Sequence, residues 1–209
     1  MVADDTKARI RAVAMELFTA QGYEQTSLRE IADRVGMTKA SLYYHYPSKQ
    51  ALLLALIEPL VEEWRREVEA AEQDAYSPST VRVRLGRILD TMIRHRDACA
   101  IVMRDTPALT SVKPILQEMI HVGTRLHAWL AGPHPTEVDR IKAVAASEVL
   151  GGAVSSVVTI AEVSPVVLRQ TLLDVAMGVL GMTPEPAEGT DAPQVAAQRV
   201  PVNSSRVHG

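Results

Sequence analysis

A short apolar helix followed by a glycine, near the N-terminus, constrains the fold of this chain more than any other feature. It lies within TSLREIADRVGMTKASLYYHYPSKQALLLAL, residues 26–56. Ser27 and Glu30 have the spacing of a capping box, in which the serine oxygen accepts from a first-turn amide and the glutamate reaches back. An apolar stripe follows for only two turns before Gly36 interrupts it, so the pattern predicts a short helix that ends in a tight turn.

A second short helix is expected directly after this turn. Thr38 is placed to cap a helix that runs from Lys39 to about His45, and Leu42 is its inward-facing anchor. Two short helices joined by a glycine turn are typical of a helix-turn-helix, whose second helix projects from the body of the domain. That shape fits the major groove of B-DNA.

The predicted second helix has an unusual outer face. With Leu42 turned inward, most of the remaining side chains from Lys39 to His45 are left outside. Tyr43, Tyr44 and Tyr46 fall within four residues, although aromatic residues make up only 4% of the chain. We expect Tyr46 to pack beneath the helix and the other two rings to be exposed.

The rest of the chain has the periodicity of an all-α protein of about nine helices. The first helix is expected from Thr6 to Gln21 and is ended by Gly22. The two short helices described above are the second and third. A long fourth helix is expected to begin after Pro47 and Ser48, with a kink near Ile57 and Glu58 caused by Pro59. Further helices are expected at about 80–97, 112–130, 136–161 and 165–181, with a short turn over 98–104. We therefore expect a helix-turn-helix domain at 1–50, a larger helical domain at 51–183 and a disordered tail at 184–209.

Charge and composition limit the kinds of partner. The formal net charge is -3, but residues 1–50 carry +1 and the remainder carries -4. Any DNA binding must therefore depend on a few well-placed groups and not on bulk electrostatics. Neither a secretory signal nor a membrane-spanning stretch is recognised, and a single cysteine, Cys99, fits a cytoplasmic protein.

The segment GMTKASLYYHYPSKQALL resembles the DNA-binding domain of the tetracycline-repressor (TetR) family. The resemblance covers about Thr6 to Leu56, and the later helices agree with that family only in number and order. It implies a transcriptional regulator, typically a repressor, that binds double-stranded DNA at a palindromic operator and is released by a small hydrophobic effector. It also implies a homodimer formed through the last two long helices.

Carried over by position, the resemblance divides the predicted DNA contacts into two groups. Base edges or nearby phosphates would be contacted by Thr38, Lys39, Ala40 and Ser41. The DNA backbone would be contacted by Tyr43, Tyr44, His45 and Lys49, with Thr26 and Ser27 adding phosphate contacts at the start of the preceding helix. The chemistry is suitable, because lysine can donate to guanine O6 and N7 and an alanine methyl can pack against thymine.

The resemblance further implies an apolar effector cavity between the DNA-binding head and the dimer interface. Its candidate lining is Met92, His95, Cys99, Met103, Arg104, His121 and Trp129, with Ile93, Met119 and Val154 as further candidates. Each of these residues could equally belong to a filled core. A helix rich in alanine, glycine and serine over 143–156 would allow close approach of another helix, either within the chain or from a second copy.

Other interpretations stay open at this point. The helical hairpin could be an ordinary solvated surface, or the head could bind DNA beneath a solid rear domain without an effector. A small helical enzyme and a protein-interaction adaptor are further alternatives, but neither explains the exposed face of the helix after Thr38. Cys99 has no assignable histidine and aspartate partners, and His121 and His127 lack metal-ligand spacing, so we expect no catalytic site, no metal and no cofactor.

Overall fold

The computed structural model describes residues 2–157 and 163–182, and every regular element in these ranges is an α-helix. The described residues form ten helices, which confirms the all-α prediction. Among these helices, no segment is both long and apolar enough to span a membrane. The predicted tail at 184–209 lies outside the described residues.

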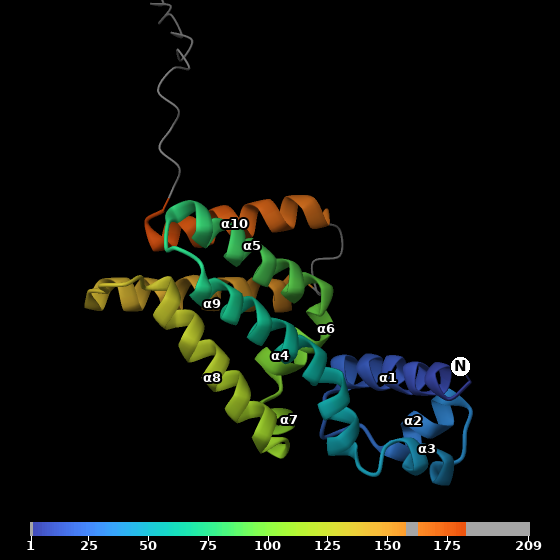
Figure 1. Ribbon diagram of the computed structural model, residues 1–209. Coiled ribbons are helices and arrows are strands. Elements are labelled where there is room, and N and C mark those ends of the chain that lie inside the picture. The colour runs from blue at the N-terminus through green and yellow to red at the C-terminus, as the bar shows by residue number, and fades with distance from the viewer. Residues whose placement is uncertain (1, 158–162, 183–209) are drawn as a thin grey trace, which may run out of the picture.

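The first three helices form a compact head at one end of the molecule (Figure 1). They are α1 (Val2–Gln21), α2 (Leu28–Val35) and α3 (Lys39–His45). Gly22 and Gly36 both adopt a left-handed backbone, with φ of 88° and 80°, where a side chain would be strained. These two turns confirm the predicted ends of the first two helices.

The capping box at α2 is only half formed. The Ser27 hydroxyl oxygen accepts from the Glu30 amide at 3.1 Å, as predicted. The Glu30 carboxylate instead accepts from the Gln21 side-chain amide, at 3.0 and 3.1 Å. The reciprocal bond was therefore predicted wrongly, because the last turn of α1 supplies a donor that the local sequence pattern cannot show.

The long helix α4 (Lys49–Gln73) connects the head to the rest of the molecule. Ser48 caps it, with its hydroxyl oxygen accepting from the Ala51 amide at 3.0 Å. Pro59 lies inside the helix, where it can supply no backbone donor, and the helix continues past it. The ribbon changes direction partway along α4 in Figure 1, in agreement with a bend at an internal proline.

The segment after α4 contains more helix than the sequence pattern indicated. It consists of α5 (Pro78–Arg94), α6 (Arg96–Arg104) and α7 (Thr106–Ser111). The turn expected over 98–104 is wrong, because these residues belong to α6. Ala98 to Val102 are all buried, so they show no alternation between apolar and polar sides from which a helix could be recognised. This segment also explains why ten helices are described where about nine were expected.

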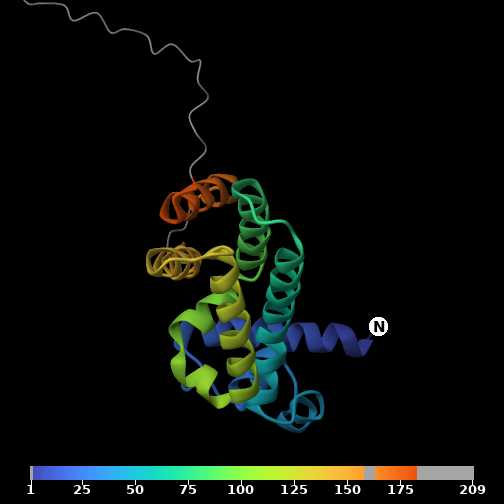
Figure 2. The same ribbon diagram turned by 60° about the vertical axis from the view of Figure 1, so that its left-hand side comes forward.

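The last three helices complete the rear of the molecule. They are α8 (Lys113–Leu130), α9 (Glu137–Val157) and α10 (Pro165–Leu180). The two views together place the pair α9 and α10 side by side, at the end of the molecule opposite the head (Figure 2). The cavity described below lies among the helices between these two ends.

Candidate DNA-contacting face and ligand cavity

The outer face of α3 is held away from the core by its own local structure. The Thr38 hydroxyl oxygen accepts from the Ser41 amide at 3.1 Å, which fixes the start of the helix. Leu42 is fully buried beneath it, and Tyr46 is buried at its end. Tyr43 is 41% exposed and Tyr44 is 87% exposed, so both rings lie outside the core. Two neighbouring exposed rings at the end of one short helix leave its outer face available for contact with a partner.

Charged and aromatic groups lie close together on this face. The Lys39 ammonium lies 5.5 Å from the centre of the Tyr43 ring, and the Tyr44 and His45 rings meet edge to face at 5.5 Å. Ala40 is exposed, and Ser41 is half-buried. Lysine, serine and phenol groups therefore share one outward surface, and these are donors that suit base edges and phosphate oxygens.

A depression of about 470 Å³ lies next to this face. It is lined by residues before and within the first turn of α2, by Lys39 and Tyr43 of α3, and by the start of α4. The amides at a helix start point outward and favour anions, so two such starts beside Lys39 suit a phosphate group. Arg29 also lines the depression and was not among the residues expected from the sequence.

Two residues predicted to contact DNA are used inside the head. The Lys49 ammonium donates to the carbonyl oxygens of Tyr23 at 2.8 Å and Thr26 at 3.0 Å, and it lies 4.2 Å from the centre of the Tyr23 ring. The Thr26 hydroxyl is buried and donates to the Gly22 carbonyl at 2.8 Å. A phosphate contact by either side chain, as predicted from the sequence, would have to compete with these internal hydrogen bonds.

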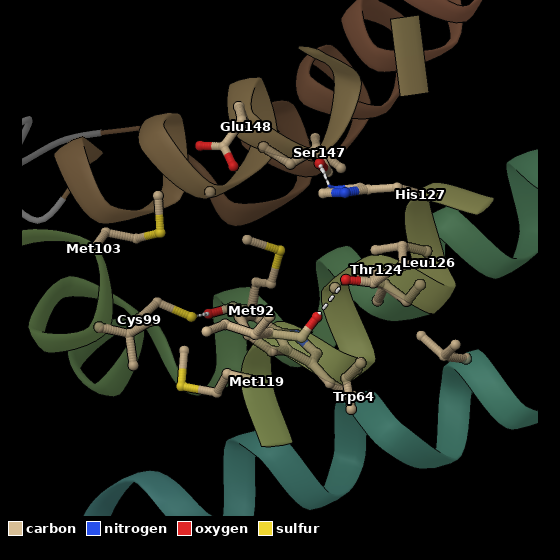
Figure 3. A pocket seen from close by; sticks show the side chains of 18 of the residues that line it. Trp64, Met92, Cys99, Met103, Met119, Thr124, Leu126, His127, Ser147 and Glu148 are labelled. Atoms are coloured by element: carbon tan, nitrogen blue, oxygen red, sulfur yellow. Dashed lines mark hydrogen bonds between the residues drawn. The ribbon is translucent and has the colours of Figure 1, made fainter. Parts of the chain in front are cut away.

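A cavity of about 380 Å³ lies behind the head, walled by α4, α5, α6, α8 and α9. Figure 3 shows its side chains converging from these helices. Of the expected lining, Met92, Cys99, Met103 and Met119 are present. The wall is mainly apolar and rich in sulfur, which gives it an adaptable shape.

The other expected cavity residues lie elsewhere. His95 lies 3.1 Å from a Glu63 carboxylate oxygen, and the Trp129 ring packs on Tyr76 with ring centres 6.0 Å apart. Arg104 and His121 are exposed at the surface. Ile93 and Val154 pack in or against the core and do not line the cavity. The sequence gives no face assignment for single residues on these helices, so it did not separate the lining from the core.

The polar groups of the cavity wall include Cys99, which was predicted to line it, His127, which was interpreted as a core-edge or pocket residue, and Ser147, which was not predicted. Ser147 donates to the Val144 carbonyl at 2.8 Å, so the 2.7 Å contact between His127 Nε2 and the Ser147 oxygen requires His127 to donate. Burial lowers the pKa of His127, against an opposing effect of Glu148. Burial likewise raises the pKa of Cys99 to about 12, with Asp97 contributing. Both groups are therefore held uncharged near neutral pH.

Trp64 and Glu148 are two further wall residues that were not predicted from the sequence. The Trp64 indole nitrogen is buried and has no hydrogen-bond partner within the described chain. Glu148 lies beside Ser147 on the α9 side of the cavity (Figure 3). The sequence did hold a signal for it, because Glu148 is the lone carboxylate inside the apolar stretch from Ala143 to Val157.

One acidic side chain connects the cavity region to the head. Asp105 follows α6 and accepts from the Tyr23 amide at 2.7 Å through one carboxylate oxygen. Its other oxygen accepts from the Ala108 amide at 3.0 Å and caps α7. The turn after α1 is therefore tied to the end of a helix that lines the cavity.

Comparisons with known proteins agree with the head and with the overall fold. Residues 10–56 match the family described as bacterial regulatory proteins, tetR family. The chain is 32% identical over 68 residues to the HTH-type transcriptional regulator RutR of Escherichia coli, a match that covers 32% of each protein. It is 36% identical over 59 residues to EthR of Mycolicibacterium smegmatis, covering 28% of this chain and 27% of EthR. These matches span about a third of the length of either curated relative.

Solved structures extend the likeness to the rear helices. The crystal structure of AmtR from Mycobacterium smegmatis superposes with a TM-score of 0.71 at 24% identity, covering 84% of this chain and 86% of AmtR. A transcriptional regulator from Aquifex aeolicus gives a TM-score of 0.65 at 23% identity, covering 83% of this chain and 99% of that chain. At these identities the likeness shows the fold.

The fold and the exposed α3 define an all-α protein with an N-terminal helix-turn-helix head and a larger helical rear part. Through residues 10–56, that head matches the tetR family of bacterial regulatory proteins, and the described helices share the fold of AmtR.

Proposed function

We propose that this protein is a sequence-specific DNA-binding transcriptional regulator, and that it acts as a cytoplasmic repressor. Residues 1–50 form its DNA-binding domain and 51–183 its effector-binding and dimerisation domain. The observation that carries the proposal is the outward face of α3, where Lys39, Tyr43 and Tyr44 stand clear of a buried Leu42. The sequence similarity of the head to RutR and EthR, both HTH-type transcriptional regulators, supports it.

Within this face, the side chains have separate tasks. Lys39 and Ser41 reach base edges, and Ala40 packs against a thymine methyl. Tyr43, Tyr44 and His45 donate to phosphate oxygens, which position the head without reading sequence. Thr38 and Ser27 cap their helices and remain exposed beside the phosphates, and Arg29 joins this second group.

The protein acts as a homodimer through α9 and α10. Their outer sides expose large apolar side chains, including Ile141 at 69% and Val166 at 76%. Large apolar side chains exposed on two neighbouring helices would lose contact with water if these helices paired with a second copy. A two-fold axis at this end would present two copies of α3 about 34–36 Å apart, which calls for a palindromic operator.

The cavity favours regulation by a small effector over a regulator with a solid rear domain. Its wall includes Met103 near the end of α6, and α6 leads directly to Asp105 and its hydrogen bond to the turn at Tyr23. A ligand that moves the end of α6 would therefore shift the head of one copy relative to the head of the other copy in the dimer. DNA affinity falls if the ligand binds the shifted arrangement more tightly.

Selection of bound duplexes from a random pool tests the proposed function. We expect enrichment of one palindrome. The centres of its half-sites should be separated by one turn of DNA, about 10 base pairs, or by a whole number of turns. Binding to that palindrome should exceed binding to scrambled DNA by about 10³-fold or more at physiological salt. Recovery of no preferred sequence would overturn the proposal of a sequence-specific regulator.

A further inference from the structure

Near neutral pH, one side chain among the described residues of the cavity wall carries a charge. Within residues 2–157 and 163–182, its ionisable side chains are Cys99, His127 and Glu148, and neither lysine nor arginine lines it. The raised pKa of Cys99 and the lowered pKa of His127 keep those two groups uncharged near neutral pH. The carboxylate of Glu148 is therefore the charge that an occupant of the cavity meets.

Glu148 is also free of the ion pairs that engage carboxylates nearby. Glu63, Glu69 and Glu72 of α4 all pair with arginines. Glu148 has no ion-pair partner within 4.0 Å in the described part of the chain. It is exposed, as are Met103, Ile120 and Thr124 of the lining, so these four wall residues are in contact with solvent.

The rest of the wall suits the apolar body of a ligand. Met92, Met103 and Met119 project towards the space from three different helices, and Trp64 closes another side (Figure 3). Methionine side chains adapt to irregular shapes, and an indole ring offers a large apolar surface. An anion inside this wall would lose hydration and face Glu148 with no compensating cation.

We propose that the cavity binds a lipophilic monocation, an apolar molecule with one protonated or quaternary amine, whose charge lies at Glu148. The proposal rests on the effector role of the cavity, but the binding itself does not require DNA. The ligand enters with its apolar part among the methionines and keeps its ammonium group at the opening, partly in solvent.

A charge series of ten-carbon probes tests this selectivity. Decyltrimethylammonium, 1-decanol and decyl sulfate share one decyl chain and differ in charge. The two ionic probes are used below their micelle concentrations and 1-decanol below its solubility limit. The chain contains two tryptophans, of which Trp129 packs on Tyr76 outside the cavity. A Trp129→Phe background therefore leaves Trp64 as the reporter of cavity occupancy by fluorescence.

The expected order of affinity is cation, then alcohol, then anion, with the cation favoured over the alcohol by about fivefold or more. Glu148→Gln should remove the preference for the cation and leave decanol binding unchanged. Glu137→Gln is the matched control, because it removes a carboxylate from the same helix outside the cavity and should leave the order intact.

Equal or tighter binding of decyl sulfate would overturn the proposal, as would an unchanged order in Glu148→Gln. Failure of all three probes to quench Trp64 would also overturn it. These outcomes concern the free protein, so they are distinguishable from a failure of the proposed function, which would appear as absence of a preferred DNA sequence.

Discussion

Lys49 illustrates how a residue predicted to contact DNA can serve the head itself. Replacing it by methionine keeps the length of the side chain but removes the donors to the Tyr23 and Thr26 carbonyls. We expect the free energy of unfolding to fall by about 1–3 kcal/mol, as for hydrogen bonds to a charged group. Thermal and chemical unfolding measure this, with the exposed neighbour Gln50→Met as control.

The same variant distinguishes the two roles of Lys49. If its ammonium stays with the carbonyls, the slope of DNA affinity against salt concentration is that of the wild-type protein. A decrease of about one in the slope would show that Lys49 neutralises a phosphate and would contradict the structural role.

Residue-scale prediction from the sequence succeeded where local rules apply. Thr38, Gly36 and Leu42 form a cap, a left-handed turn and an anchor, each determined by residues within a few positions. It failed for the second half of the capping box at Glu30, and it did not reveal the internal bonds of Lys49; these partners are supplied by α1 and by the turn that follows it. Contacts between elements of this kind have no signature in a local sequence pattern.

At the scale of elements, the connection between α6, α7 and the turn after α1 is the part most open to test. Asp105→Ala removes both the α7 cap and the acceptor for the Tyr23 amide. Loss of the cap alone should cost about 1–2 kcal/mol of stability. We further expect a cavity ligand to bind this variant as before while changing its DNA affinity less than in the wild-type protein.

Direct ligand titration and DNA binding with and without ligand measure the two quantities separately. Asp97→Ala, which removes a carboxylate from α6 with no contact to Tyr23, is the control and should keep the wild-type response. An Asp105→Ala protein whose DNA affinity responds fully to ligand would show that the signal passes by another route.

The sequence predicted elements well only where they are amphipathic. The apolar stripe of α2 and the inward leucine of α3 allowed the extent of each helix to be predicted. The uniformly buried run in α6 has no such pattern, and its helix was not predicted. The cavity illustrates the same limit, because its wall combines single residues from five helices whose packing the sequence does not specify. Glu148 could have been identified as a lone charge among apolar neighbours, but not assigned to a cavity.

At the scale of the whole molecule, association through α9 and α10 should govern DNA binding. Ile141 on α9 and Val167 on α10 are 69% and 58% exposed, and a glutamate at both positions would place repelling charges across a symmetric interface. We expect this double variant to sediment as a monomer and to bind the palindrome more weakly than the wild-type protein. Val83→Glu, on an equally exposed site of α5, should remain dimeric.

The central claim is that α3 reads DNA, and Lys39→Ala tests it most directly, because Lys39 is exposed and its loss should not affect folding. The measurement is the affinity of wild-type and variant protein for the selected palindrome and for duplexes changed at single base pairs. We expect the free energy of binding to the palindrome to weaken by about 1–3 kcal/mol in the variant, and its preference for one base at one position of each half-site to be lost. Unchanged affinity and unchanged base preference would contradict the account.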